Sequence, residues 1–233
     1  TVIILLKTLN AWACLGCLGW RGFAWGCWGL LELAWFCLGL LWPLNGAVLF
    51  PGTSLPLNIF EKRYIEMVDY ALSKERYIGM IQSDEKNKLY NIGCIGKIHS
   101  FSETTDGRYL ISLQGTNCFK VKKELEKKYK FRLVEAEMLV FDEDNNVINE
   151  KQKNNLLDKY SQYIKVKKIN LNLEEIQNID FNQIIKFIAM ISPFSDIEKQ
   201  VLLETKSLRD FYKKLHSILE LEIVEDNNSK TIN

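Results

Sequence analysis

The residues with the greatest potential for chemistry are few and lie far apart along the chain. Cys14 and Cys17 have the CxxC spacing that can hold a metal ion or form a redox pair, but no second pair follows them. The two histidines, His99 and His216, are distant in sequence and fall in a predicted strand and a predicted helix. A zinc site needs several convergent ligands, so we expect no metal site. We also expect no redox site, because no βαβ pattern surrounds the cysteines.

Two acid–base pairs have structural explanations that are simpler than catalysis. Glu61 and Arg63 are two residues apart on a predicted helix and would point to different faces. We therefore expect Glu61 to contribute to a helix cap and Arg63 to form a salt bridge. Asp106 and Arg108 flank Gly107 and are expected to set a turn.

No motif for phosphate binding or nucleophilic catalysis occurs in the sequence. The GxxxxGK[ST] loop is absent, and its nearest candidate, residues 46–52, is a strand end bounded by prolines. There is no GxSxG nucleophile elbow, no HExxH zinc motif and no serine beside a recognisable base. The sequence therefore predicts a binding protein with no catalytic, cofactor-binding or metal-binding residues and no cofactor.

The elements that must position a binding surface begin at residues 43–64, PLNGAVLFPGTSLPLNIFEKRY. Residues 47–50 are predicted to form a short strand that ends in a tight turn at residues 51–52. The Pro-Leu pair that follows requires extended backbone, and Asn58 is then predicted to cap a helix together with Glu61. The apolar face of that helix comprises Phe60, Tyr64, Met67, Val68, Ala71 and Leu72.

Residues 77–140 show the pattern of successive strands. Apolar and polar residues alternate over most of this range, and the Asp-Gly pair at 106–107 supplies the positive φ of a hairpin turn. Gly93, Gly96 and Gly115 fall within or beside the strands, where glycines allow a sheet to bend. We therefore predict a small, coiled antiparallel β-barrel with one inserted helix.

The hydrophobic period becomes helical after DEDNN at residues 142–146. The Ser-Pro pair at 192–193 is predicted to end one helix, Ser195 to form a capping box with Glu198 for the next, and Ser207 to begin the last. The predicted fold class is α+β, a barrel followed by a C-terminal α-helical bundle. The predicted segments are a leader at 1–39, the barrel subdomain at 40–141, the helical subdomain at 147–224 and a disordered tail at 225–233.

The first 42 residues differ in composition from the rest of the chain. They contain all six tryptophans, and their only charged residues are Lys7, Arg21 and Glu32. Residues 23–41 contain Glu32 as their only charge and are numerous enough to span a bilayer as a helix. Alternatively, the leader is a non-native extension, because its Trp/Cys/Gly bias lacks the periodicity of a helix. Both interpretations stay open.

Charge and cysteine usage bear on partners and location. The chain has 30 lysines and arginines against 29 aspartates and glutamates, so no broad basic surface for nucleic acid is predicted. Cys94 and Cys118 fall in predicted strands and are interpreted as buried thiols of a reducing compartment. We therefore expect a cytoplasmic protein, or a membrane-anchored one if residues 1–42 are native.

Several segments together resemble a known family. They are the opening at 43–64, RYIGMIQ at 76–82, the strand–turn–strand block at 90–121 and SPFSDIEKQVLLE at 192–204. In this order they resemble the substrate-binding (N-terminal) domain family of Lon proteases, over residues 40–222. The positions that match the family motif are Pro43, Phe50, Pro51, Pro56, Leu57, Asn58, Phe60, Glu61, Arg63, Tyr64, Gly79, Gly93, Gly96, Asp106, Gly107, Arg108, Tyr109 and Gly115.

The resemblance implies a PUA-like barrel and a helical bundle that recognise unfolded or extended polypeptide, or a partner protein, in protein quality control. Full-length Lon proteases add an ATPase and a protease domain, whose motifs do not occur here, so we expect no nucleotide and no enzymatic activity. A groove between barrel and helices, with a sheet edge, would hold the peptide. Tyr64, Phe101 and Phe194 are candidate peptide contacts, although core packing is the stronger expectation for each.

Two alternative functions remain. A PUA-like RNA-binding module would need a basic face, which the balanced charge does not predict. A membrane-tethered quality-control adaptor would use residues 1–42 as its anchor.

Overall fold

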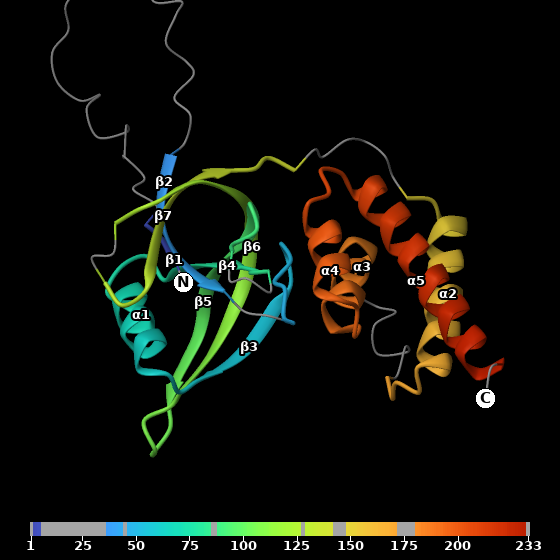
Figure 1. The fold of residues 1–233 in the computed structure, drawn as a ribbon, viewed down its shortest axis with the longest axis horizontal. Coiled ribbons are helices and arrows are strands. Elements are labelled where there is room, and N and C mark those ends of the chain that lie inside the picture. Colours follow the sequence, from blue (N-terminus) through green and yellow to red (C-terminus); the bar gives the residue numbers. More distant parts are fainter. Residues whose placement is uncertain are drawn as a thin grey trace, which may run out of the picture.

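The computed structural model describes residues 2–5, 36–43, 46–84, 88–126, 129–141, 148–171 and 180–231, with side chains described between residues 46 and 226. These residues form an α+β fold in which a curved, mainly antiparallel sheet lies beside a group of helices (Figure 1). The strands are β1 (Val2–Leu5), β2 (Phe36–Pro43), β3 (Ser54–Ile59), β4 (Tyr77–Ile81), β5 (Ile92–Glu103), β6 (Tyr109–Glu124) and β7 (Arg132–Met138). The helices are α1 (Lys62–Leu72), α2 (Glu150–Val166), α3 (Phe181–Ile191), α4 (Asp196–Leu203) and α5 (Leu208–Thr231).

The strands follow the order β1-β7-β2-β4-β5-β6-β3, with further pairings of β1 with β2 and of β7 with β6. β6 therefore pairs with three strands, β3, β5 and β7, all antiparallel. The pairing of β2 with β4 is parallel. α1 is the one helix inserted between described strands, and it lies on the side of the sheet away from α2–α5 (Figure 1).

One large hydrophobic core joins the sheet to the helices. It contains residues of β4, β5 and β6, of α1 and of all four C-terminal helices, among them the fully buried Leu113, Tyr160 and Leu215. A smaller core lies on the opposite face of the strands and comprises Ile81, Ile95, Phe119, Val134 and Ala136. Because neighbouring residues on a strand face opposite sides, β5 and β6 contribute to both cores.

The residues before α1 differ from the sequence-based prediction. Asn58 lies in β3, where it pairs with Leu110 of β6. α1 begins at Lys62 with Glu61 as its N-cap residue and without a side-chain capping bond. The predicted cap by Asn58 and Glu61 is wrong, because pairing with β6 keeps the chain extended as far as Ile59 and delays the helix.

The predicted strand at residues 47–50 is also wrong. These residues belong to no strand, and the last three of them are buried in the large core. Their apolar run therefore reflects burial and not strand pairing. The turn at residues 51–52 is confirmed, since Gly52 has a φ of 85° and its N–H donates to the Gly115 carbonyl oxygen at 2.9 Å.

The helical part follows the sequence closely. α3 ends immediately before Ser192, which is its C-cap. Ser195 and Glu198 form the predicted capping box of α4. At the start of α5, the Asp210 N–H donates to the Ser207 hydroxyl at 3.2 Å. The predicted boundary at residues 142–146 lies outside the described residues.

The predicted disordered tail at residues 225–233 is wrong for most of its length, because α5 continues to Thr231. Lys167 at the end of α2 forms ion pairs with Glu222 at 2.7 Å and with Asp226 at 3.7 Å. These ion pairs hold the C-terminal half of α5 beside α2, so a polar sequence remains helical there.

Part of the predicted leader belongs to the sheet. β1 lies within it, and β2 begins at Phe36 and pairs with both β4 and β7. The end of the predicted membrane segment, residues 36–41, is therefore a strand, while residues 23–35 lie outside the described residues. No helix among the described residues is long and apolar enough to cross a membrane.

Candidate functional site

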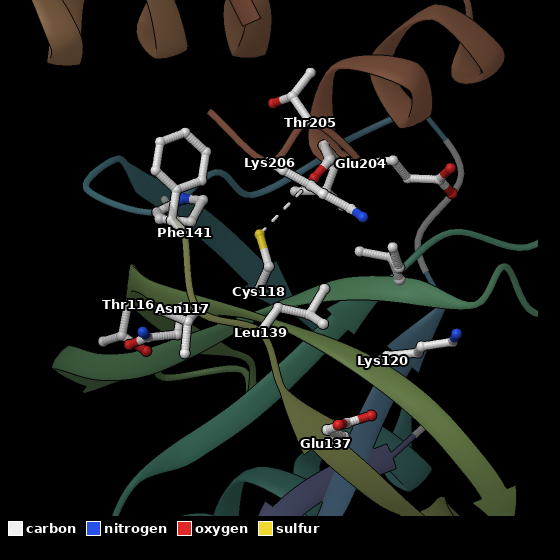
Figure 2. Close-up of a pocket in the computed structure, with 14 residues that line it drawn as sticks. Thr116, Asn117, Cys118, Lys120, Glu137, Leu139, Phe141, Glu204, Thr205 and Lys206 are labelled. Atoms are coloured by element: carbon white, nitrogen blue, oxygen red, sulfur yellow. Dashed lines mark hydrogen bonds between the residues drawn. The ribbon is translucent and has the colours of Figure 1, made fainter. Parts of the chain in front are cut away.

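A cleft lies between the sheet and the helices, next to the end of α4 (Figure 2). Its volume is about 420 Å³, which is within the range of small ligand-binding pockets. Cys118 and Lys120 of β6 line one side, residues 139–141 after β7 line the second, and residues 203–206 between α4 and α5 line the third.

The alternation of β6 determines which residues face the cleft. Phe119 is buried in the smaller core, so its neighbours Cys118 and Lys120 face the opposite side, toward the helices. The N–H of Leu139 donates to the Cys118 carbonyl oxygen at 2.9 Å, so pairing with β6 continues one residue past β7. The chain then leaves the sheet, and Val140 is 89% exposed where it lines the cleft.

Polar contacts hold α4 against the sheet and thereby fix the helical wall of the cleft. The Gln200 amide nitrogen donates to the Ile92 carbonyl oxygen of β5 at 3.1 Å and to the Glu204 carboxylate at 2.8 Å. The Lys199 ammonium donates to the Gly46 carbonyl oxygen at 3.1 Å. Burial lowers the pKa of Lys199. α4 is thus bonded to two separate segments of the β-rich part.

Cys118 lies inside the cleft as an unreactive thiol. Burial raises the pKa of Cys118 to about 12, and the nearby Lys186 ammonium offsets this only in part. The Cys118 Sγ points toward the Leu203 carbonyl oxygen at 3.9 Å, drawn as a dashed line in Figure 2. Its partner across β5 and β6, Cys94, is fully buried, and burial raises its pKa as well. Protonated thiols are poor nucleophiles, so this site is suited to non-covalent binding.

The carboxylates that line the cleft already have partners. Glu137 forms an ion pair with Lys122, and the hydrogen bond from Lys122 lowers the pKa of Glu137. Glu204 accepts the hydrogen bond from α4 described above. The Lys186 ammonium lies 5.4 Å from the centre of the Phe141 ring, and burial lowers the pKa of Lys186. The cleft therefore combines an apolar wall with nearby lysines.

The predicted residues at the β5–β6 hairpin form a turn, and none of them lines the cleft. Gly107 has a φ of 76°, and the Arg108 guanidinium lies 2.7 Å from the Asp106 carboxylate. A hydrogen bond from Thr104, with a smaller contribution from Arg108, lowers the pKa of Asp106. Tyr109 donates to the Asp69 carboxylate of α1 at 3.0 Å, so this end of the sheet is bonded to α1.

Glu61 and Arg63 contact each other, contrary to the prediction that they point to different faces. The Arg63 Nε lies 2.7 Å from a Glu61 carboxylate oxygen, and the guanidinium lies 4.5 Å from the centre of the Tyr64 ring. The prediction failed because Glu61 precedes the first helical turn and has extended backbone. The salt bridge predicted for Arg63 is confirmed.

The matched glycines keep backbone segments close together. A Cβ atom on Gly115 would lie 2.1 Å from the Phe50 carbonyl oxygen, and one on Gly93 would lie 2.4 Å from the Met80 carbonyl oxygen. Neither distance is possible for a real side chain, so both glycines serve the packing of the sheet.

The three candidate peptide contacts lie away from the lining of the cleft. Tyr64 and Phe194 are 7% and 4% exposed, whereas Phe101 is 42% exposed and packs edge-on against Tyr109 with ring centres 4.9 Å apart. Sequence reasoning missed Cys118 and residues 139–141 because apolar positions in strands also read as core. The available signal was the apolar run that continues past β7 into the polar segment at 142–146.

The residues that the structure describes contain no group of three or more histidine, cysteine, aspartate or glutamate side chains that could hold a metal ion. The CxxC pair, Cys14 and Cys17, lies outside those residues.

Relatives of known family align with this chain over only part of their own length. The Lon protease of Buchnera aphidicola subsp. Baizongia pistaciae is 26% identical over 195 residues, covering 78% of this chain and 24% of the relative. The Lon protease of Clostridioides difficile is 26% identical over 198 residues, covering 78% of this chain and 25% of the relative. The chain therefore spans about a quarter of the length of these proteins.

Solved structures show the same fold. A Lon N-terminal domain protein from Xanthomonas campestris superposes with a TM-score of 0.57 at 18% identity, covering 78% of this chain and 97% of that one. The N-terminal domain of a Mycobacterium avium complex Lon protease gives a TM-score of 0.54 at 14% identity, covering 78% and 98%. The model of the ATP-dependent protease La (LON) substrate-binding domain matches residues 40–220. With its β-rich half, the four helices described after it and this match, the chain belongs to the Lon substrate-binding domain family.

Proposed function

We propose that this chain is a non-catalytic recognition module that binds extended or unfolded polypeptide in the cleft beside α4, in protein quality control. Membership of a substrate-binding domain family supports binding of polypeptide in general. The observation that carries the proposal is the apolar segment at residues 139–141, which lines the cleft and leaves Val140 almost fully exposed. An exposed apolar wall in a concave site favours an apolar ligand.

The free edge of β3 is a poorer place for a peptide. β3 is the last strand in the sheet order, and Pro56 lies in its middle. Proline has no N–H to donate, so the strand offers an incomplete ladder to an added strand. We therefore place the peptide in the cleft, against side chains.

Charge pairing supports a polypeptide ligand over RNA. Three of the five described basic residues between Lys120 and Arg132 have acidic partners: Lys122 pairs with Glu137, Arg132 lies 3.4 Å from Glu124, and Lys130 lies 2.9 Å from Glu66 of α1. A backbone-binding RNA surface requires cations that are available to phosphates.

Two finer statements belong to the same proposal. We propose that the curved sheet is a PUA-like barrel, and the pairing of β6 with both β5 and β7 supports this geometry. We also propose that the protein acts in the cytoplasm, and the free thiols Cys94 and Cys118 are consistent with a reducing compartment.

Peptide binding to the full chain tests the proposal. Fluorescence anisotropy with a labelled apolar peptide of about 12 residues should give saturable binding, and Val140→Asn should weaken it about tenfold. Replacing a buried valine contact by a polar side chain costs about 1.5 kcal/mol, which corresponds to that factor.

The matched control is Val224→Asn, a similar change at an exposed valine of α5, which is 55% exposed. It should leave the affinity unchanged. Absence of saturable binding, or an equal loss in both variants, would contradict the proposed site.

A further inference from the structure

One end of the cleft has charged side chains, and the other has Phe141 beside uncharged polar side chains. Figure 2 shows the side chains of Lys120 and Lys206 extending to one side of the view, whereas Phe141, Thr116 and Asn117 lie on the other. Lys120 comes from β6 and Lys206 from the connection between α4 and α5, so the two lysines belong to different walls. Both residues are exposed.

The two lysines are available for a ligand, whereas the two glutamates of the lining are engaged. Among the described residues, the side chains of Lys120 and Lys206 have no hydrogen bond and no ion pair within salt-bridge distance. Lys120 lies opposite Glu137 in the β6–β7 ladder and acts on its carboxylate electrostatically, whereas the hydrogen bond of Glu137 comes from Lys122. Glu204 accepts from Gln200 at 2.8 Å. A ligand carboxylate in the cleft could therefore accept hydrogen bonds from the two unpaired lysines. A ligand cation would find both glutamates already paired.

The local charge balance is positive. Two further lysines adjoin the lining, Lys122 beside Glu137 and Lys186 against the Phe141 ring, and Asp180 acts on Lys186, so four lysines stand against three carboxylates. The electrostatic field of these charges is stronger in a concave site with apolar walls, because the walls have a low dielectric constant.

The following proposal rests on the proposed function and specifies which polypeptide segments the cleft binds. We propose that the cleft selects polypeptide segments in which an apolar side chain is followed or preceded closely by a carboxylate. The apolar side chain contacts residues 139–141, and the carboxylate lies between Lys120 and Lys206. The occupant is thus an acidic apolar segment of an extended chain.

Three labelled peptides with one apolar core, flanked by aspartate, asparagine or lysine, test this selectivity against the full chain. The aspartate peptide should bind about fivefold more tightly than the lysine peptide at low ionic strength, since each exposed charge contact contributes less than about 1 kcal/mol. The difference should shrink in 0.5 M salt, where the screening length falls to a few ångströms.

The double variant Lys120→Glu with Lys206→Glu should abolish or invert the preference. Its matched control is Lys151→Glu with Lys213→Glu, which makes the same change in net charge at exposed positions of α2 and α5. Circular dichroism confirms that both variants are folded.

The outcomes separate the two proposals. Equal affinity of all three peptides for the unchanged protein would overturn the charge selectivity and leave the cleft proposal standing. An equal effect of the control double variant would also overturn it, because net charge alone would then explain the preference. Failure of every peptide to bind would overturn both.

Discussion

At the scale of single residues, Cys118 joins the sheet, the helices and the cleft. It pairs with Cys94 across β5 and β6, its Sγ approaches the end of α4, and it lines the cleft. The same burial that makes its thiol a poor nucleophile makes it sensitive to alkaline pH, because a thiolate cannot be solvated there.

Stability should therefore fall at alkaline pH. An acid whose pKa is raised by folding contributes stability that is present below its ordinary pKa, here 9.0, and lost as the pH rises toward the folded value of about 12. At a pH of about 10.5, Cys118 alone should remove about 2 kcal/mol from the free energy of unfolding, measured by urea denaturation. Burial raises the pKa of Cys94 and Tyr160 also, so these groups act in the same direction.

The buried lysines act in the opposite sense. Burial lowers the pKa of Lys186 and Lys199, so their contributions to stability increase as the pH rises toward the ordinary lysine value. The variant Cys118→Ala isolates the thiol, and its stability should decline by about 2 kcal/mol less over the same pH range. An unchanged pH dependence in this variant would contradict the assignment.

Single residues were predictable where local geometry alone decides their role. The positive φ of Gly107 follows from a hairpin turn, and the close packing at Gly115 follows from a glycine within a strand. The cation–π contact of Lys186 with Phe141 could not be predicted, because α3 and the segment after β7 meet only through the tertiary fold. Contacts between distant segments leave no periodic signal in a sequence.

At the scale of elements, α4 connects the two halves of the molecule. It is short, and its bonds to Gly46 and Ile92 position the residues that follow it in the cleft. A short helix depends strongly on its caps, because few internal hydrogen bonds oppose fraying. Ser195 and Glu198 supply those caps reciprocally, with bonds of 2.8 Å from the Ser195 N–H and 3.3 Å from the Glu198 N–H.

Ser195→Ala should destabilise the protein by about 1 kcal/mol, measured by urea denaturation. Hydrogen exchange should increase at the amides of α4 more than at those of α2, since the first turn of α4 loses its acceptor. Ser217→Ala at an exposed position of α5 is the control and should not destabilise the protein, because alanine has a higher helix propensity than serine. Equal destabilisation by the two changes would exclude a special role for the cap.

A helix or strand could be predicted when the sequence pattern that specifies it lies within a few consecutive residues and no distant strand competes for them. The capping box of α4 is contained within four residues, and its prediction is confirmed. The cap predicted from Asn58 and Glu61 has the same pattern and is wrong, because β6 pairs with Asn58 and extends the strand. A capping pattern alone therefore does not decide where a helix begins, because pairing with a distant strand can keep the same residues extended.

At the scale of the whole molecule, the sheet and the helices share one core, so the cleft is built on a continuous unit. β2 has a central place in the sheet, with six residue pairs to β7 and three to β4. Neither β1 nor the first half of β2 was predicted to belong to the fold, because their Trp- and Cys-rich surroundings hide the strand pattern. The match to the family nevertheless begins at residue 40, inside β2.

Truncation at two points tests the role of β2. Deleting residues 1–35 removes β1 but keeps β2, and the remaining chain should unfold cooperatively when heated, followed by circular dichroism. Deleting residues 1–43 removes β2 as well as β1, so β4 loses β2 and β7 loses both of these partner strands. The loss of these ladders should cost several kcal/mol, a large part of the stability of a typical domain. The longer deletion should therefore abolish the cooperative transition, and equal transitions in both truncated chains would show that the sheet does not need β2.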